Sequence, residues 1–198
     1  ALAPIQTSPA SRASSAAAPP SGADSKVYTL SLKQLGIGQP IELRGVEGER
    51  TIPFTVRSDE VITAAKVRYG IAYSPSLLPD LSHLKVAVNG ELISVVALPK
   101  ETANGIVREE TIDPRVFTDF NQLSFKLIGH YTRDCEDPFH SSLWAKISDT
   151  TNLELTVSQI ALQNDLAQLH APFFDKRDGK LLTLPFVLPA NVSFEVLK

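Results

Sequence analysis

The chain has 198 residues, of which 43% are hydrophobic and 21% are charged, and its formal net charge at pH 7 is −3. This length accommodates one domain with tails, and the slightly acidic balance argues against a surface for nucleic acid or anionic membranes. No apolar run approaches the roughly 18 to 20 residues that a membrane-spanning helix requires. The single cysteine, Cys135, excludes an internal disulfide.

The first 25 residues form a lead of small side chains. Residues 1–25 consist largely of Ala, Ser and Pro. Such a segment cannot bury enough apolar area to offset the entropy that is lost on ordering. We therefore predict a flexible lead that serves as a spacer.

From Lys26 onward, apolar residues recur at every second position, which is the period of a half-buried strand. The longest run predicts one strand face made of Val61, Thr63, Ala65, Val67, Tyr69, Ile71 and Tyr73. Lys66, Arg68 and Gly70 are predicted on the opposite face. Later strands are predicted at residues 106–112, 123–128, 143–147 and 153–157.

Two short segments predict turns between these strands. Asn89-Gly90 readily adopts the two positive φ angles of a type I′ turn and predicts a β-hairpin. Residues 45–50 predict a second hairpin turn. About ten short strands, separated by Pro, Gly, Asn and Asp, predict an all-β antiparallel sandwich or barrel.

The end of the chain has a different pattern. Residues 181–188 form a short apolar run that is typical of a strand buried on both faces. Asn191 and Ser193 are suitable N-caps for a following helix. Residues 171–198 are therefore predicted to be a linker and the first β-α segment of an α/β domain. Because such a unit cannot bury its own faces, we expect the chain to be a fragment of a longer protein.

Residues 130–144 connect two predicted strands and contain the only cysteine, the only tryptophan and two of the four histidines. The apolar residues Leu143 and Ala145 flank Trp144. If they face the core, Trp144 shares the solvent face with Lys146. An exposed indole on a flat sheet is a natural platform for the apolar C–H face of a pyranose ring. Large aromatic residues are usually mostly buried, so alternation alone leaves a core position for Trp144 open.

A thiol nucleophile with a histidine base is one alternative chemistry for this loop. Its members would be Cys135 with His130 or His140, oriented by Asp134 or Asp137. The members of such dyads usually come from different elements of a fold. An ordinary loop cysteine, or one half of a bridge to a domain outside this chain, is therefore the favoured interpretation.

A metal site is the other alternative. The spacing His-x4-Cys-x4-His matches none of the usual zinc patterns. Calcium requires a denser alternation of oxygen ligands than Asp134, Glu136 and Asp137 provide. We expect these acids to cap turns, and we predict neither a metal nor another cofactor.

Eight motifs follow one another through most of the chain after residue 26. They are 41–46 (IELRGV), 54–61 (FTVRSDEV), 73–82 (YSPSLLPDLS), 113–121 (DPRVFTDFN), 127–132 (LIGHYT), 135–138 (CEDP), 140–144 (HSSLW) and 171–175 (APFFD). In this order they closely resemble the family of bacterial cellulose synthase regulatory subunits, which is often labelled cyclic di-GMP-binding.

This resemblance implies a jelly-roll carbohydrate-binding-type domain at residues 26–170 and the start of a flavodoxin-like domain at residues 171–198. It implies a non-catalytic periplasmic subunit, attached to the inner membrane through a C-terminal helix absent from this chain. The implied partners are the cellulose synthase catalytic subunit, the extruded β-1,4-glucan and other copies of the regulatory subunit, and they include no nucleic acid. The family's nucleotide pocket belongs to the catalytic subunit, so no direct binding of cyclic di-GMP is expected.

The resemblance also bears on Trp144, because the first jelly roll of the family has an aromatic residue suited to the emerging glucan. Trp144 is the matching position. The first hypothesis is therefore a domain that contacts and guides extruded glucan through Trp144. The alternative is a structural assembly module that mediates contacts between subunits and has only vestigial sugar binding.

Overall fold

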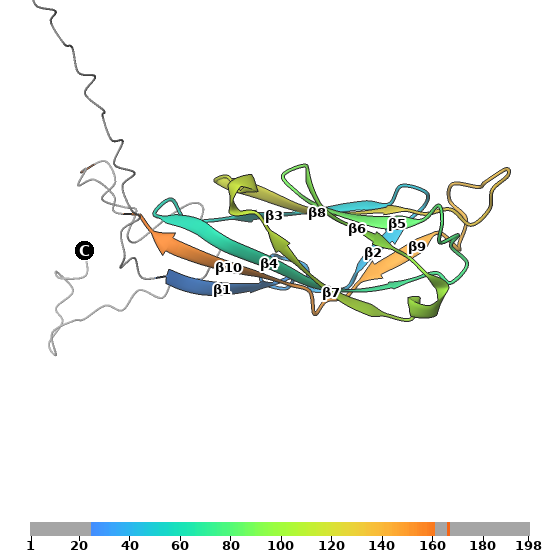
Figure 1. Cartoon of the computed structure of the whole chain (residues 1–198), viewed down its shortest axis with the longest axis horizontal. Helices are drawn as coiled ribbons and strands as arrows, with labels where there is room; N and C mark the ends of the chain where they lie inside the picture. Colours follow the sequence, from blue (N-terminus) through green and yellow to red (C-terminus); the bar gives the residue numbers. More distant parts are fainter. Residues whose placement is uncertain (1–24, 161–165, 167–198) are drawn as a thin grey trace, which may run out of the picture.

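The structure is a computed structural model that describes residues 25–160 and residue 166 (Figure 1). As the alternating sequence predicts, the described chain is almost entirely β. Its strands are β1 (Ser25–Ser31), β2 (Ile41–Arg44), β3 (Glu49–Thr55), β4 (Glu60–Tyr73), β5 (His83–Val88), β6 (Glu91–Ala97), β7 (Ile106–Ile112), β8 (Phe120–Ile128), β9 (Trp144–Ile147) and β10 (Asn152–Gln159). The helical turns η1 (Lys100–Thr102) and η2 (Pro114–Val116) flank β7. No helix among the described residues is long and apolar enough to cross a membrane.

The strands form two antiparallel sheets that pack face to face (Figure 1). The first sheet, here called sheet A, has the order β1-β10-β4-β9-β2, with β7 also paired to β4. The second, sheet B, has the order β3-β8-β5-β6. Every pairing between strands is antiparallel.

In sheet A, β1 with β2 and β9 with β10 each form one long strand that is interrupted by a connection. β9 and β10 pair with consecutive stretches of the same edge of β4, while β7 occupies its other edge. β1 and β2 in turn pair with β10 and β9. With β1–β2 and β9–β10 each taken as one strand, sheet A has the order first-eighth-third-sixth and sheet B the order second-seventh-fourth-fifth. This is the eight-stranded order of a jelly roll, so the predicted fold is confirmed.

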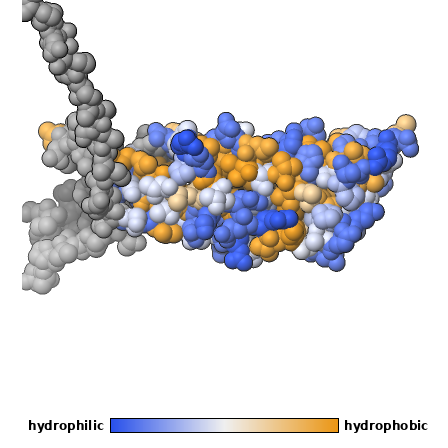
Figure 2. Space-filling view, in the orientation of Figure 1, coloured by the Kyte–Doolittle hydropathy of each residue, from blue (hydrophilic) through white to orange (hydrophobic). Residues whose placement is uncertain are grey.

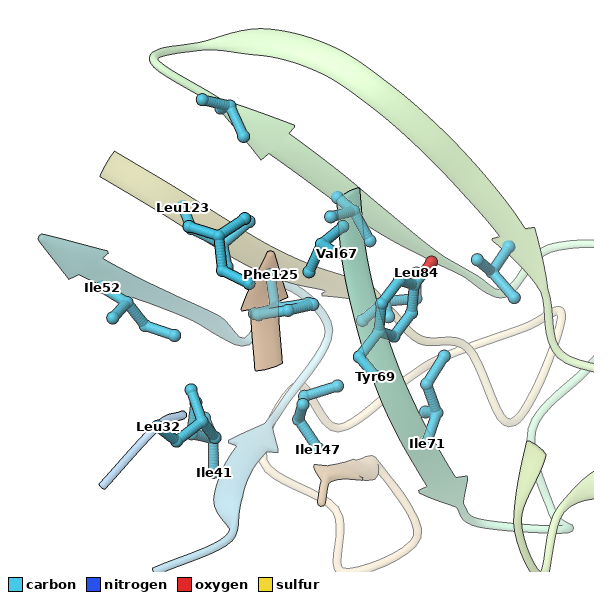
Figure 3. Close-up of a cluster of buried hydrophobic side chains, with 14 of the residues drawn as sticks. Leu32, Ile41, Ile52, Val67, Tyr69, Ile71, Leu84, Leu123, Phe125 and Ile147 are labelled. Carbon is cyan, nitrogen blue, oxygen red and sulfur yellow. The ribbon is translucent and has the colours of Figure 1, made fainter. Parts of the chain in front are cut away.

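Side chains from the inner faces of both sheets fill the sandwich (Figure 3). Tyr69 of β4 and Phe125 of β8 meet edge to face, with ring centroids 5.5 Å apart. Aliphatic residues from both sheets belong to the same buried cluster: Leu32, Ile41, Ile52, Val67, Ile71, Leu84, Leu123 and Ile147. Burial of each such side chain stabilises the fold by roughly 1.5–3 kcal/mol, so the core holds the sheets in a fixed register.

The two ends of the sandwich differ (Figure 1). The connections at residues 45–48, 74–82, 98–105 and 129–143 gather at one end, here called the loop end. Hydrogen bonds join them there, for example from the Leu78 N–H to the His130 carbonyl at 2.7 Å. β1 begins and β10 ends at the opposite end, where Ser25 is paired with Ser158. Sites at the loop end are therefore remote from the points where the chain enters and leaves the sandwich.

The predicted face of β4 is right for only part of the strand. Its apolar positions from residue 65 to residue 73 are buried, but Val61 and Thr63 are exposed and Ile62 is buried instead. The pairing with β10 shifts beside Thr63, which is the extra residue of a β-bulge. Because side chains alternate between the faces of a strand, one extra residue reverses the assignment of all that precede it.

The prediction of a hairpin at residues 45–50 is wrong. β2 pairs with β9 and β3 pairs with β8, so this segment crosses from sheet A to sheet B. A Cβ atom on Gly48 would lie 2.6 Å from the backbone N and O of Arg44, which only glycine avoids. The predicted hairpin at Asn89-Gly90 is confirmed, because both residues have positive φ angles, 53° and 86°.

Some predictions concern residues that the structure does not describe. The predicted lead lies outside the described residues except for Ser25, which begins β1. The predicted β-α segment at residues 171–198 lies outside them completely.

Candidate functional site

Trp144 is the first residue of β9 and lies on the outer face of sheet A. Its neighbours Leu143 and Ala145 are buried, with exposed fractions of 1% and 0%, whereas Trp144 is only partly buried. The alternation therefore places the indole on the solvent side, together with Lys146, as the first of the two interpretations predicts. Its role in binding stays a prediction.

Three charged side chains of β2 and β9 lie near the indole on this face. Arg44 of β2 is the cross-strand partner of Trp144, and Glu42 is the partner of Lys146. The Arg44 guanidinium donates a hydrogen bond of 2.8 Å to the Glu42 carboxylate. Lys146 Nζ lies 3.6 Å from the same carboxylate and 6.0 Å from the centroid of the indole ring. We call Glu42, Arg44, Trp144 and Lys146 the Trp144 platform.

The charges of the Trp144 platform fix its ionisation state. The hydrogen bond from Arg44 lowers the pKa of Glu42, and the charges of Arg44 and Lys146 lower it further against an opposing effect of desolvation. At neutral pH Glu42 is therefore a carboxylate that accepts hydrogen bonds, while the two cations donate them. An apolar ring beside such groups can hold a molecule with one apolar face and many hydroxyl groups.

The loop at residues 129–143 precedes Trp144 and is braced by its own side chains. His130 Nδ1 lies 2.8 Å from a Glu136 carboxylate oxygen, and the Tyr131 N–H donates to the other oxygen at 2.9 Å. The Tyr131 ring stacks on His140 with a centroid distance of 4.2 Å, and its hydroxyl accepts a hydrogen bond from the Asp137 N–H. These contacts give the loop one defined shape.

Contacts with the neighbouring loop at residues 74–82 add to this bracing. Arg133 forms an ion pair with Asp80, and Ser82 exchanges hydrogen bonds with the backbone of His130. Phe139, in contrast, is 89% exposed. Figure 2 shows a mostly hydrophilic surface at the loop end, so an exposed aromatic ring is unusual there. The braced loop therefore presents Phe139 to solvent.

The Glu136 carboxylate is the centre of the braced loop. Desolvation raises its pKa, but the hydrogen bonds from the Tyr131 N–H and from His130 outweigh this effect. The pKa of Glu136 consequently lies below the ordinary value of 4.5. The carboxylate is ionised at neutral pH and can hold both partners.

The thiol–histidine alternative gains no geometric support. Cys135 is free and exposed. His130 is engaged by Glu136, and His140 is stacked on Tyr131. In the described part of the chain, no hydrogen bond joins the thiol to either histidine.

The acids of the loop have structural contacts. The Asp137 carboxylate accepts a hydrogen bond of 3.0 Å from the Phe139 N–H, as expected for an acid that caps a turn. Neither Asp134 nor Asp137 orients a histidine ring, since the carboxylate on His130 is that of Glu136. Between residues 25 and 160, no three His, Cys, Asp or Glu side chains are grouped as a metal would require.

Glu42 and Arg44 were not predicted as site residues from the sequence. Both occupy the outward positions of a short strand that alternates Ile, Glu, Leu and Arg. The alternation predicts that they face solvent, but only the pairing of β2 with β9 brings them beside Trp144. That pairing joins residues about one hundred positions apart, and no local pattern indicates it.

Comparison with known proteins identifies the family. The family model described as cellulose synthase BcsB, first CBM domain, matches residues 25–159, which is the whole jelly roll. The chain belongs to the BcsB family. The resemblance found in the sequence motifs is thereby confirmed.

Three relatives of this BcsB domain come from different bacteria. The chain is 52% identical to a cyclic di-GMP-binding protein of Xanthomonas axonopodis pv. citri, over 92% of the chain and 23% of the relative. It is 49% identical to a protein of the same name from Pseudomonas fluorescens, over 81% of the chain and 21% of the relative. It is 38% identical to putative cellulose synthase 2 of Komagataeibacter xylinus, over 82% of the chain and 11% of the relative.

The chain spans less than a quarter of the length of these BcsB relatives. Among solved structures, a sugar-binding domain at the C-terminus of EclA covers 75% of the chain at 10% identity and a TM-score of 0.37, and the match takes in 89% of that domain. That likeness is too distant to support a conclusion. The family assignment therefore rests on the sequence match and on the jelly-roll order of the strands.

Proposed function

We propose that this chain is the glucan-contacting domain of a non-catalytic, periplasmic subunit of the cellulose synthase complex. In this proposal the Trp144 platform binds extruded β-1,4-glucan and helps to guide it away from the catalytic subunit. The observation that supports it most directly is the partly buried indole of Trp144 on the outer face of sheet A, near an ionised Glu42 carboxylate and two cations.

The chemistry of the platform suits a sugar ring. A pyranose has an apolar C–H face that packs on an indole, and hydroxyl groups at its rim that both donate and accept hydrogen bonds. Glu42 supplies acceptors at this rim, and Arg44 and Lys146 supply donors. Because Glu42 pairs with both cations, the platform keeps only one net positive formal charge, which a neutral ligand tolerates.

The site lies on the outer face of a sheet, which suits a moving polymer. Such a face buries only one side of its ligand, so its affinity is expected to be weak. Tight binding would hold the polymer in place and slow its extrusion. A weak contact limits sideways motion of the chain and allows it to slide.

Two observations support the remaining parts of the proposal. The relative from Komagataeibacter xylinus carries a matching segment within a protein named as a putative cellulose synthase, which supports association with the catalytic subunit. The histidines of the loop are held by Glu136 and Tyr131, which supports a non-catalytic role. We also propose a periplasmic location, with a membrane anchor elsewhere in the full-length protein, on the basis of the family resemblance.

Calorimetric titration of the chain with cello-oligosaccharides tests the proposal. Trp144→Ala is expected to weaken binding by about tenfold, which corresponds to about 1.4 kcal/mol of lost contact. Phe139→Ala is the matched control, because it removes the other exposed aromatic ring at the loop end. Equal affinities for wild type and Trp144→Ala would refute the assignment of the platform.

A second candidate function is an assembly module that contacts other subunits or other copies of itself. The observation that favours it is Phe139, which is exposed on a loop of defined shape, as interface anchors often are. Sedimentation of the chain with and without Phe139→Ala tests this function. Self-association that Phe139→Ala abolishes, together with no affinity for cello-oligosaccharides, would favour assembly over glucan contact.

The name of two of these relatives raises cyclic di-GMP as a ligand, and we expect this chain not to bind it. The ligand is a dianion and would require cations that are available for its phosphates. Among the seven arginines that the structure describes, four are paired with carboxylates, which lowers the positive charge that phosphates would meet: Arg44 with Glu42, Arg57 with Asp59, Arg115 with Asp113 and Arg133 with Asp80. Calorimetry with cyclic di-GMP is expected to show no heat of binding, and a saturable signal would contradict this expectation.

A further inference from the structure

A groove lies beside the Trp144 platform, at the edge of sheet A where β2 is the last strand. Its volume is about 560 Å³, and residues 36–42 and Arg50 line it. Glu42 belongs both to this groove and to the Trp144 platform. We call it the edge groove.

The wall of the edge groove is ordered backbone. The N–H of Ile37 donates to the Leu32 carbonyl at 2.8 Å, and the N–H of Gly36 donates to the Lys33 carbonyl at 3.1 Å. Gly36 has a φ of +83°, which lets the chain turn sharply before it enters β2. The groove is therefore present before any ligand binds, and its wall needs no reorganisation.

The groove has a mixed lining whose formal charge is zero. Glu42 and Arg50 supply one carboxylate and one cation, and Gln39 supplies an amide. Ile37 and Pro40 add apolar surface. An uncharged chain of hydroxyl-bearing rings matches this lining, whereas an anionic polymer would meet the Glu42 carboxylate.

A long ligand that starts on Trp144 could also run along β4, towards a hollow on the outer face of sheet A. This shallow hollow has a volume of about 150 Å³ and is lined by Thr29, Lys66, Arg68, Glu109, Asn152 and Glu154. The Ser74 N–H binds the Trp144 carbonyl, and Asn152 is paired with Arg68. Trp144 is therefore level with Ser74 and the hollow is level with Arg68, six positions away along the chain, which is about 20 Å at the rise of a strand.

The edge groove is much nearer to the indole. Trp144 is opposite Arg44, and Glu42 lies two residues further along β2. Such diagonal neighbours in a sheet are roughly 7–8 Å apart. A ligand that covers the indole thus reaches the edge groove with its next rings, long before it could reach the hollow.

We propose that the edge groove is a second subsite for the glucan chain that stacks on Trp144, so that the polymer crosses β2 and continues between residues 36–41 and Arg50. This inference rests on the proposed function. Glu42 lies at the junction and contacts the chain in both subsites. Arg50 and Gln39 bind hydroxyl groups of the rings beyond Trp144.

Length dependence of binding tests the second subsite. Calorimetry is carried out with cellobiose and with longer cello-oligosaccharides on the same variants. Gly38→Leu adds a bulky side chain to the lining of the groove. A Cβ atom at this position meets nothing within 4 Å and no positive φ is required, so folding is expected to be preserved. Arg50→Gln removes the cation and keeps most of the side chain.

Both variants are expected to weaken binding of the long oligosaccharides by about tenfold and to leave cellobiose binding unchanged. Thr29→Leu, which fills the hollow on sheet A, and Gln122→Leu, on the outer face of sheet B, serve as controls. Thermal unfolding of each variant shows whether the fold is retained. Neither control is expected to change any affinity.

Three outcomes overturn the proposal, and they are distinguishable. If Thr29→Leu weakens long-chain binding and Gly38→Leu does not, the polymer runs along β4 and not across β2. If wild-type affinity is the same for every length, there is no second subsite, although the Trp144 platform stands. If the wild type binds no oligosaccharide, the proposed function itself fails, and the second subsite fails with it.

Discussion

The sandwich and the loop at residues 129–143 are held together in opposite ways. Apolar side chains from two sheets enclose the sandwich core, where Phe125 is 0% exposed. The loop is held by single polar contacts, such as the one between His130 and Glu136, while Phe139 is 89% exposed. The comparison teaches that burial stabilises the fold as a whole, whereas a few hydrogen bonds define a local shape. Substitutions in the sandwich core should therefore lower the free energy of unfolding of the whole domain, whereas substitutions in the loop should have smaller and local effects.

The largest effect is expected for Phe125→Ala. The ring is fully buried and meets Tyr69 edge to face, so its removal leaves a cavity between the sheets. Truncation of a buried Phe to Ala typically costs about 3–5 kcal/mol. Chemical denaturation should show this loss in the free energy of unfolding. A loss below about 1 kcal/mol would mean that this core does not hold the sandwich.

A smaller global effect is expected for Asn121→Ala, which changes a polar group within the sandwich. Asn121 is 1% exposed, and its amide bonds the backbone of Thr118 in both directions, at 2.7 and 2.8 Å, and the Asn89 side chain at 2.8 Å. Its loss leaves buried partners unsatisfied, which costs about 1–3 kcal/mol. Denaturation is the measurement, and Gln122→Ala on the exposed face is the control with no expected effect.

A local effect is expected for Glu136→Gln in the loop. The substitution removes the charge that holds His130 but keeps an acceptor for the Tyr131 N–H. Because the contact is partly exposed, the change in global stability is expected to be about 1 kcal/mol or less. Amide hydrogen exchange should rise within residues 129–143 and stay unchanged in β8. A uniform rise across the sandwich would contradict the separation of the two regions.

Acid should have the same local effect as Glu136→Gln. The folded state lowers the pKa of Glu136 below 4.5, so its stabilisation is complete above that value and is lost as the pH falls through the lower, folded pKa. Hydrogen exchange of the loop, corrected for the intrinsic effect of pH on exchange, should therefore accelerate in acid below pH 4.5. The Glu136→Gln variant should lack this acid step, and a step of equal size in both proteins would disprove the assignment.

The smallest effect on stability is expected for Phe139→Ala. The ring is almost fully exposed, so its removal should change the free energy of unfolding by no more than about 0.5 kcal/mol. Together with Phe125→Ala, it compares the same chemical change in the two regions. A loss of several kcal/mol would show that Phe139 packs against the loop, which would weaken its candidacy as an interface anchor.

Sequence alone predicted the sandwich well, because burial on one face of a strand imposes a period of two. For Trp144 the same period left both faces open, and the two buried neighbours in the structure place the indole on the outer face. The bulge at Thr63 was missed, since one extra residue leaves the composition of the strand unchanged. The crossing at residues 45–50 was also missed, because its Gly-rich sequence resembles that of a hairpin turn.

The candidate site was predicted only in part. Trp144 was found, but Glu42 and Arg44 were not, because the pairing of β2 with β9 is long-range. In the loop, the acids were expected to cap turns, and Asp137 does so. Glu136 instead binds His130 and the Tyr131 N–H. Such side-chain contacts depend on the folded path of the loop, which no periodic pattern encodes.

The pairing of Ser25 with Ser158 has a geometric consequence. It puts the first and last strands of the jelly roll side by side, at the end of the sandwich opposite the loop end. β4, with 14 residues, spans about 45 Å between these two ends. A protein segment fused to either end of the jelly roll would therefore begin far from Trp144 and leave the indole accessible.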